Sequence, residues 1–290
     1  MEILLARDMG FCWGVRRAID IMEKAAEEWG EIISLGPIVH NPQVVRELEE
    51  KGVRASEQEA DGDARTVAIT AHGVGPAILE DAQARGAEVI DTTCPIVTRS
   101  QRWAKKMAGE GFTVVIFGDP AHREVKGVLG WAGPHGMAIR DGDPIPHDLP
   151  SRLAIISQTT QSAERFADFV AELMRKRVGE IGELRVINTL CDVTSNQQAA
   201  ASELAQEVDV VIVVGGRSSA NTRHLLDVCR EKGASAYHVE GPAEVEADWF
   251  KGCERVGVTA GASTPDSAVE TVVRRIQAIA AELDATAGRR

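Results

Sequence analysis

The stretch VIDTTC at residues 89–94 recurs as VINTLC at residues 186–191, and in each copy a helical pattern follows the final cysteine. A third apolar stretch, at residues 3–6, leads to Cys12 and then to a helical pattern at residues 15–25. Self-similarity of this kind is typical of chains built from repeated supersecondary units. We therefore predict three related units with one cysteine at the same place in each, the N-terminal strand completing the last unit.

A second repeat points to the same division. TAHG at residues 70–73 aligns with TAGA at residues 259–262, with a proline shortly after each. Around these repeats β-branched runs alternate with segments of helical spacing, which predicts an α/β fold with mainly parallel sheets. We expect three α/β units, formed by residues 13–94, by residues 95–190, and by residues 191–290 together with 1–12. Ligands of such sheets bind beyond the carboxyl ends of the strands.

The charge of the chain excludes one class of partner. The 290 residues carry 32 Lys and Arg against 44 Asp and Glu, a formal net charge of −12. Such a chain does not bind nucleic acid through bulk charge. No basic segment precedes the short apolar stretch at the N-terminus, and no run of apolar residues approaches the length of a membrane span. We therefore expect a soluble cytoplasmic protein without a membrane partner.

The cysteines are best interpreted as metal ligands. Five widely scattered cysteines do not resemble a disulfide framework. Equivalent loops of three related units would converge on a pseudo-threefold axis and bring together Cys12, Cys94 and Cys191. Zinc normally recruits a fourth ligand at C-x-x-C spacing, which is absent here, whereas an iron–sulfur cubane with three thiolates keeps one iron open to substrate. The alternative for each cysteine is an ordinary buried thiol, the role we assign to Cys229 and Cys253.

Polar residues follow several of the predicted strands. Histidines in these loops, and hydroxyl and amide side chains that precede helices, can hold phosphate oxygens without any lysine. Plain helix capping is the alternative for each of them. The candidates for this anion site are His40, His72, His122, Ser219, Asn221 and Ser263.

Two further residues are candidates for chemistry. Glu124 lies two residues after His122, and its carboxyl group could move protons if burial raises its pKa. The alternative is a solvated surface glutamate. Thr159 could orient a substrate hydroxyl or cap the following helix, and its spacing from the other candidates does not decide between these roles.

An ordered set of motifs now resembles one family. The motifs are GFCWGV at 10–15, VHN at 39–41, AHGV at 71–74, DTTCP at 91–95, HREV at 122–125, QTT at 158–160 and TAGAS at 259–263. Together they resemble the 4-hydroxy-3-methylbut-2-enyl diphosphate reductases, the IspH or LytB family. The resemblance implies a cloverleaf of three α/β units around a central 4Fe-4S cluster. It also implies reductive removal of the substrate's allylic hydroxyl, which yields isopentenyl and dimethylallyl diphosphates in the last step of the non-mevalonate isoprenoid pathway.

The resemblance also assigns roles to single residues. It implies that Cys12, Cys94 and Cys191 hold the cluster, that Thr159 lies near the substrate hydroxyl and that Glu124 belongs to a proton relay. The residues implied around the diphosphate are His40, His72, His122, Ser219, Ala220, Asn221 and Ser263. Ala220 stands where the family often has a second serine, so any phosphate contact there comes from its backbone N–H. Two alternatives remain open, an iron–sulfur redox sensor or electron carrier and an iron–sulfur hydro-lyase.

A reductase of this kind needs an external electron donor, and the resemblance implies one of the ferredoxin or flavodoxin type. Such carriers are usually acidic, so this acidic protein needs a local basic patch to dock one. The candidates are Arg16-Arg17, Lys105-Lys106 and residues 175–177. An ordinary solvated helix face is the alternative for each.

Overall fold

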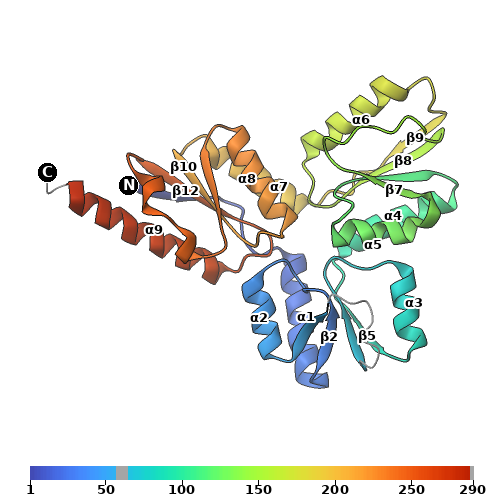
Figure 1. Ribbon diagram of the computed structural model, residues 1–290, viewed down its shortest axis with the longest axis horizontal. Coiled ribbons are helices and arrows are strands. Elements are labelled where there is room, and N and C mark those ends of the chain that lie inside the picture. Colours follow the sequence, from blue (N-terminus) through green and yellow to red (C-terminus); the bar gives the residue numbers. More distant parts are fainter. Residues whose placement is uncertain (57–64, 288–290) are drawn as a thin grey trace. The chain divides into compact units, whose positions relative to one another are not determined.

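The computed structural model describes residues 1–56 and 65–287. These residues form three sheets of four parallel strands each (Figure 1). The strands of the first sheet are β2 (Ile32–Leu35), β3 (Val53–Ser56), β4 (Thr66–Ile69) and β5 (Glu88–Asp91). Those of the second are β6 (Thr113–Phe117), β7 (Gly136–Ile139), β8 (Arg152–Ser157) and β9 (Glu183–Val186). Those of the third are β10 (Val210–Val214), β11 (Ser235–Val239), β12 (Arg255–Ala260) and β1 (Glu2–Leu5).

All three sheets have the same strand order. The order is β3-β2-β4-β5 in the first, β7-β6-β8-β9 in the second and β11-β10-β12-β1 in the third. The N-terminal strand β1 thus occupies the place of β5 and β9, pairing in parallel with β12 in a register that sets Ile3 opposite Val256. Parallel strands send their carboxyl ends to the same edge, so the loops that follow them lie together at that edge of each sheet.

Helices connect the strands, as the alternating sequence pattern predicts. They are α1 (Trp13–Trp29), α2 (Pro42–Glu50), α3 (Pro76–Ala84), α4 (Pro95–Gly109), α5 (Arg123–Ala132), α6 (Ala163–Arg177), α7 (Asp192–Ala205), α8 (Ala220–Glu231) and α9 (Asp266–Ala287). Three short 3₁₀ helices cover Gly133–His135, Pro242–Glu244 and Ala247–Phe250. Among the described residues no helix has the length and apolar character that crossing a membrane requires.

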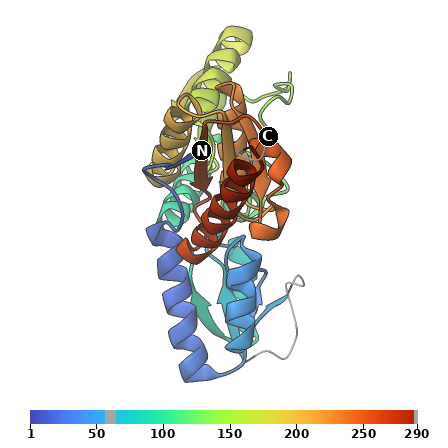
Figure 2. The same ribbon diagram turned by 90° about the vertical axis from the view of Figure 1, so that its left-hand side faces the viewer.

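Apolar side chains fill the space on both faces of the second and third sheets. In the second sheet, Ile116 and Ile156 pack against α4 and α5, while Phe117 and Ile155 pack against α6 on the opposite face. Figure 1 shows α6 on one side of this sheet and α4 and α5 on the other. In the third sheet α9 covers the face turned to the viewer in Figure 2, and α7 and α8 cover the other. Strands that are apolar on both faces are typical of parallel sheets with helices on each side.

The contacts divide the chain into two compact units. One, here called the C-terminal unit, contains Met1–Trp13, His40–Val44 and Asp192–Arg290. The other, the central unit, contains Gly14–Val39 and Val45–Cys191 and therefore carries the first and second sheets. The division into three units at residues 94 and 190 stays a prediction.

Candidate functional site

The three candidate cysteines occupy the same position in the three sheets. Each follows the fourth strand of its sheet and directly precedes a helix, α1, α4 or α7. Each donates its backbone N–H to the loop that follows the third strand. The N···O distances are 3.0 Å from Cys12 to Ala262, 3.0 Å from Cys94 to Ala71 and 2.9 Å from Cys191 to Thr159. The equivalence that the sequence repeat predicts is therefore present in the backbone hydrogen bonds.

The loops after the third strands share a turn as well. Gly73 donates its N–H to Thr70, Gln161 to Gln158, and Thr264 to Gly261. This pattern corrects the alignment of residues 70–73 with 259–262, because the hydrogen bonds align residues 70–73 with 261–264 instead. The error arose because the TA dipeptide occurs in both stretches, although Thr259 and Ala260 still belong to strand β12. The corrected register places His72 and Ser263 at equivalent positions.

The side chains fit thiolate ligands of a metal cluster. Cys12, Cys94 and Cys191 are all half-buried, and each directly precedes the first residue of a helix. By contrast Cys229 is fully buried among apolar side chains of α7 and α8, and burial raises the pKa of its thiol to about 12. Among residues 1–56 and 65–287 no three His, Cys, Asp or Glu side chains lie together as a metal site. The convergence of the three cysteines stays a prediction.

In the C-terminal unit three of the candidate phosphate ligands lie at the start of α8. Ser219 is its N-cap, and its Oγ accepts a hydrogen bond from the N–H of Thr222 at 3.3 Å. Ala220 is buried at the first helical position. The side chain of Asn221 is 3% exposed, and its Nδ2 donates to Gln197 Oε1 at 2.8 Å. Its Oδ1 is buried without a hydrogen-bond partner among the described residues. A buried acceptor of this kind indicates a missing donor.

The segment 40–44 completes this group. Ser263 Oγ donates to the carbonyl oxygen of His40 at 3.1 Å. A Cβ atom at Gly216 would lie 2.5 Å from that same oxygen, so the close approach of the His40 backbone requires glycine there. His40, Ser263 and the N-terminus of α8 are therefore held together within one compact unit.

Gln197 is a residue of this group that the sequence motifs did not reveal. Its Oε1 accepts from Asn221, while its Nε2 donates to the carbonyl oxygen of Gly10 at 2.9 Å. The side chain is buried on α7. It thereby connects Asn221 to the loop that carries Cys12. No sequence signal distinguished it from an ordinary helical glutamine.

The central unit brings the other two histidines together. His122 is the N-cap of α5, and its Nδ1 accepts a hydrogen bond from the N–H of Glu124 at 3.2 Å. The ring of His72 lies edge-on to that of His122, with centroids 5.7 Å apart, and His72 Nδ1 lies 3.1 Å from Thr70 Oγ1. Because Nδ1 of His122 acts as an acceptor, Nε2 is the nitrogen that carries its ring proton.

Glu124 and Thr159 form a buried pair. The side chain of Glu124 is 3% exposed. Its Oε1 accepts from the N–H of Thr159 at 2.7 Å, and its Oε2 accepts from Thr159 Oγ1 at 2.8 Å. Desolvation raises the pKa of Glu124 to about 7, outweighing the two hydrogen bonds that lower it. The carboxyl group is therefore poised to give or take a proton near neutral pH, which sequence spacing alone left undecided.

This pKa makes stability depend on pH. A carboxyl group whose pKa rises from 4.5 to about 7 on folding binds more protons in the folded chain, so its contribution to the free energy of unfolding falls as pH rises between those values. The fall amounts to about 3 kcal/mol. The free energy of unfolding of the Glu124→Gln variant, measured with denaturant, should therefore increasingly exceed that of the natural protein as the pH rises from 5 to 8. A constant difference over that range contradicts the shifted pKa.

The remaining four histidines lie elsewhere in the described part of the chain. His135 lies in a 3₁₀ helix, His147 in the loop before β8, and His224 on α8. His238 Nε2 lies 2.7 Å from the carbonyl oxygen of Gly215, an interaction that ties β11 to the loop after β10. We assign no functional role to these four residues.

Known proteins resemble the chain over almost its whole length. A family model described as LytB protein matches residues 3–277. A 4-hydroxy-3-methylbut-2-enyl diphosphate reductase of Dehalococcoides mccartyi (strain CBDB1) is 44% identical over 284 residues, which cover 97% of this chain and 99% of the relative. A protein of the same name from Geobacter sulfurreducens is 46% identical, covering 96% of this chain and 97% of the relative.

Two solved structures are similar as well. One is the E-1-hydroxy-2-methyl-but-2-enyl-4-diphosphate reductase of Plasmodium falciparum, with a TM-score of 0.85 and 27% identity, over 94% of this chain and 87% of that one. The other is described as (E)-4-hydroxy-3-methyl-but-2-enyl diphosphate reductase, the terminal enzyme of the non-mevalonate pathway. It has a TM-score of 0.67 and 38% identity, over 96% of this chain and 99% of that one.

Proposed function

The chain belongs to the LytB family, and we propose that it reduces 4-hydroxy-3-methylbut-2-enyl diphosphate to isopentenyl and dimethylallyl diphosphates. The reaction consumes two electrons and two protons. The allylic C–O bond breaks, the oxygen leaves as water, and a C–H bond forms on the allyl group. The relatives' shared name favours this reading over a redox sensor, an electron carrier or a hydro-lyase.

The observation that carries the proposal is the position of Thr159. Its side chain and N–H bind the carboxyl group of Glu124, and its carbonyl oxygen accepts the N–H of Cys191. One residue thus joins a carboxyl group that titrates near neutral pH to the loop of a proposed cluster ligand. We assign Glu124 the delivery of a proton to the departing hydroxyl, and Thr159 the orientation of that hydroxyl.

The cofactor we propose is a 4Fe-4S cluster held by Cys12, Cys94 and Cys191. The equivalent placement of the three thiols at helix N-termini supports it. When bound, the cluster supplies the electrons that reduce the substrate. The surrounding chain keeps the three loops in place through the same backbone hydrogen bond in each sheet.

The diphosphate is assigned to the histidines, hydroxyls and amides described above. Ser219 uses its Oγ as an acceptor within α8 and therefore still has an O–H to donate to a phosphate oxygen. Ala220 offers only its backbone N–H, which points along the helix start with those of its neighbours. Asn221, Ser263 and His40 contribute from the same unit, and His72 and His122 from the central unit. The ring N–H groups of these histidines can donate to phosphate oxygens, which supplies local anion binding in a chain of net charge −12.

The test is an anaerobic assay of the purified protein. We expect about four iron and four sulfide ions per chain, and consumption of 4-hydroxy-3-methylbut-2-enyl diphosphate with dithionite and methyl viologen as reductant. Consumption without a reductant would identify a hydro-lyase. A protein that holds iron and sulfide but binds no diphosphate would be a carrier or sensor. The cytoplasmic location and the ferredoxin or flavodoxin donor stay predictions.

A further inference from the structure

Helix α4 carries an unusual charge for this acidic chain. Of the nine α-helices in the described part of the chain, it alone has no Asp or Glu, and it contains Arg99, Arg102, Lys105 and Lys106. Within residues 1–56 and 65–287 no carboxylate forms an ion pair with any of these four side chains. The helix therefore presents uncompensated positive charge on a molecule of net charge −12.

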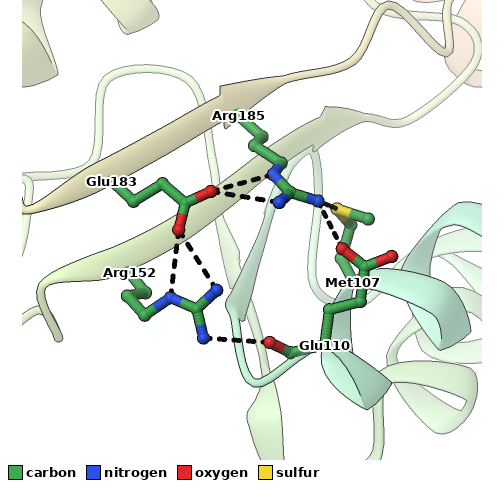
Figure 3. Close-up of polar contacts among 5 residues, drawn as sticks. All are labelled: Met107, Glu110, Arg152, Glu183 and Arg185. Carbon is green, nitrogen blue, oxygen red and sulfur yellow. Dashed lines mark hydrogen bonds and ion pairs between the residues drawn. The ribbon is translucent and has the colours of Figure 1, made fainter.

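Several cations elsewhere in the same unit are paired with carboxylates. Figure 3 shows Arg152 and Arg185 on either side of Glu183, with ion-pair distances of 3.1 and 3.0 Å, and Arg185 also paired with Glu110 just after the end of α4. On α6, Lys176 pairs with Glu172 and Arg177 with Glu180. Of the basic clusters at residues 105–106 and 175–177, the one on α6 is therefore largely compensated by carboxylates, whereas among the described residues the one on α4 is not.

Part of this charge lines a groove. A cavity of about 300 Å³ lies over α4 and is bordered by Pro95, Arg99, Arg102, Trp103 and Lys106, here called the α4 groove. These residues recur at helical spacing along one face. Trp103 is half-buried, and Lys106 Nζ lies 5.0 Å from the centre of its ring. An aromatic side chain with arginine around it is a composition typical of binding surfaces.

The α4 groove lies beside two of the proposed cluster ligands. Pro95 directly follows Cys94, the N-cap of α4. Arg99 Nη2 donates to the carbonyl oxygen of Leu190 at 3.0 Å, and Leu190 directly precedes Cys191. All of these residues belong to the central unit. A molecule that fills the α4 groove therefore touches Pro95, which follows Cys94, and Arg99, which is hydrogen-bonded to the segment that carries Cys191.

We propose that the α4 groove is the docking site of a small acidic one-electron carrier protein that supplies the reductant. The inference rests on the proposed function, because only a reductase needs that supply. Two reduced carriers dock in turn, and each leaves oxidised by one electron. The two electrons and two protons break the C–O bond, release water and form the C–H bond. Complementary charge steers such a partner to the uncompensated cations of α4 and selects its orientation there.

The experiment compares two double variants of the full chain loaded with iron and sulfide. Arg102→Glu with Lys106→Glu reverses charge in the α4 groove and spares Arg99, which contacts the Cys191 loop. Arg175→Glu with Lys176→Glu changes the net charge equally on α6, an exposed basic segment of the same unit. The probes are an acidic 2Fe-2S ferredoxin and an acidic flavodoxin. Calorimetry gives their Kd at low and at physiological salt, and turnover is measured with each carrier and with dithionite.

We expect the α4 variant to bind at least one carrier about tenfold or more weakly at low salt, with a shallower salt dependence, and to lose carrier-driven turnover in proportion. Its iron content and its dithionite-driven turnover should equal those of the natural protein. The α6 variant should bind within about twofold of the natural protein. Equal loss in both variants, loss only in the α6 variant, or failure of both carriers to bind the natural protein overturns the docking site. Absence of dithionite-driven turnover in the natural protein overturns the proposed function instead.

Discussion

Replacing Glu124 by glutamine is expected to lower turnover by about 10²- to 10⁴-fold, the range over which a positioned general acid acts. Glutamine has nearly the same shape and can still accept the N–H of Thr159, so the loop that carries Cys191 keeps its support. The glutamine amide, however, cannot release a proton near neutral pH as the carboxyl group of Glu124 can. Iron content and the Kd for the diphosphate should therefore stay unchanged while the rate of hydroxyl removal falls.

The pH profile separates proton delivery from a merely structural role. If protonated Glu124 delivers the proton, the rate of the natural protein falls as pH rises through about 7, and the residual rate of the Gln variant does not follow that curve. Glu164→Gln serves as the matched control, because Glu164 is an exposed glutamate of the same unit at the start of α6. A Glu124→Gln variant that turns over at the natural rate removes this residue from the mechanism.

The repeat was visible in the sequence because one cysteine follows the strand at the fourth position of each sheet. The three sheets have one strand order, and the N-terminal strand takes the fourth place in the third sheet. The alignment of the second repeat was wrong by two residues, because short strings of small residues leave the register of a loop undetermined. Only the turn hydrogen bonds fix it, those of Gly73, Gln161 and Thr264.

Burial was the main property that the sequence could not supply. Glu124 stands in a charged, loop-like stretch, yet its carboxyl group is enclosed because α5 begins at Arg123, just after its N-cap His122, and directs it toward Thr159, 35 positions later in the chain. Contacts between such distant positions depend on the tertiary fold. The same holds for Gln197, which joins the Asn221 amide to the loop of Cys12 from the interior of α7.

In the sequence, the charge on α4 was visible only as the basic pair Lys105-Lys106. This pair was one of three basic clusters, and nothing in the sequence gave a ground for choosing among them. The structure distinguishes them by their partners. On α6, two of the three cations are paired with carboxylates one turn away, whereas on α4 the spacing brings Arg102 and Lys106 to one face beside Trp103. Whether a cation is compensated depends on the side chains around it, and composition does not contain that information.

Serine at any one of Cys12, Cys94 or Cys191 is expected to prevent stable cluster assembly and to lower activity by at least about 10³-fold. A serine hydroxyl is a poor ligand for iron at neutral pH, because the metal requires the deprotonated group. The substitution keeps the backbone N–H that each cysteine donates to the neighbouring loop. Loss of iron therefore reports the missing thiolate and not a collapsed loop, provided that the circular dichroism of the variant matches the natural protein.

Two comparisons make the role of the cysteines as one set testable. If they hold a single cluster, the Cys94→Ser and Cys191→Ser double variant should lose no more activity than either single variant, because one missing ligand already disables the group. Cys253→Ser should retain its iron, since Cys253 lies in a turn after a 3₁₀ helix and donates to Trp249. Cys229→Ser should retain it as well, because the hydroxyl can take over the contact of Sγ with the carbonyl oxygen of Ala201 inside the core. Iron and sulfide analysis of the five single variants decides the matter: a Cys229 variant without iron beside a Cys94 variant with it would assign the cluster to a different set of thiols.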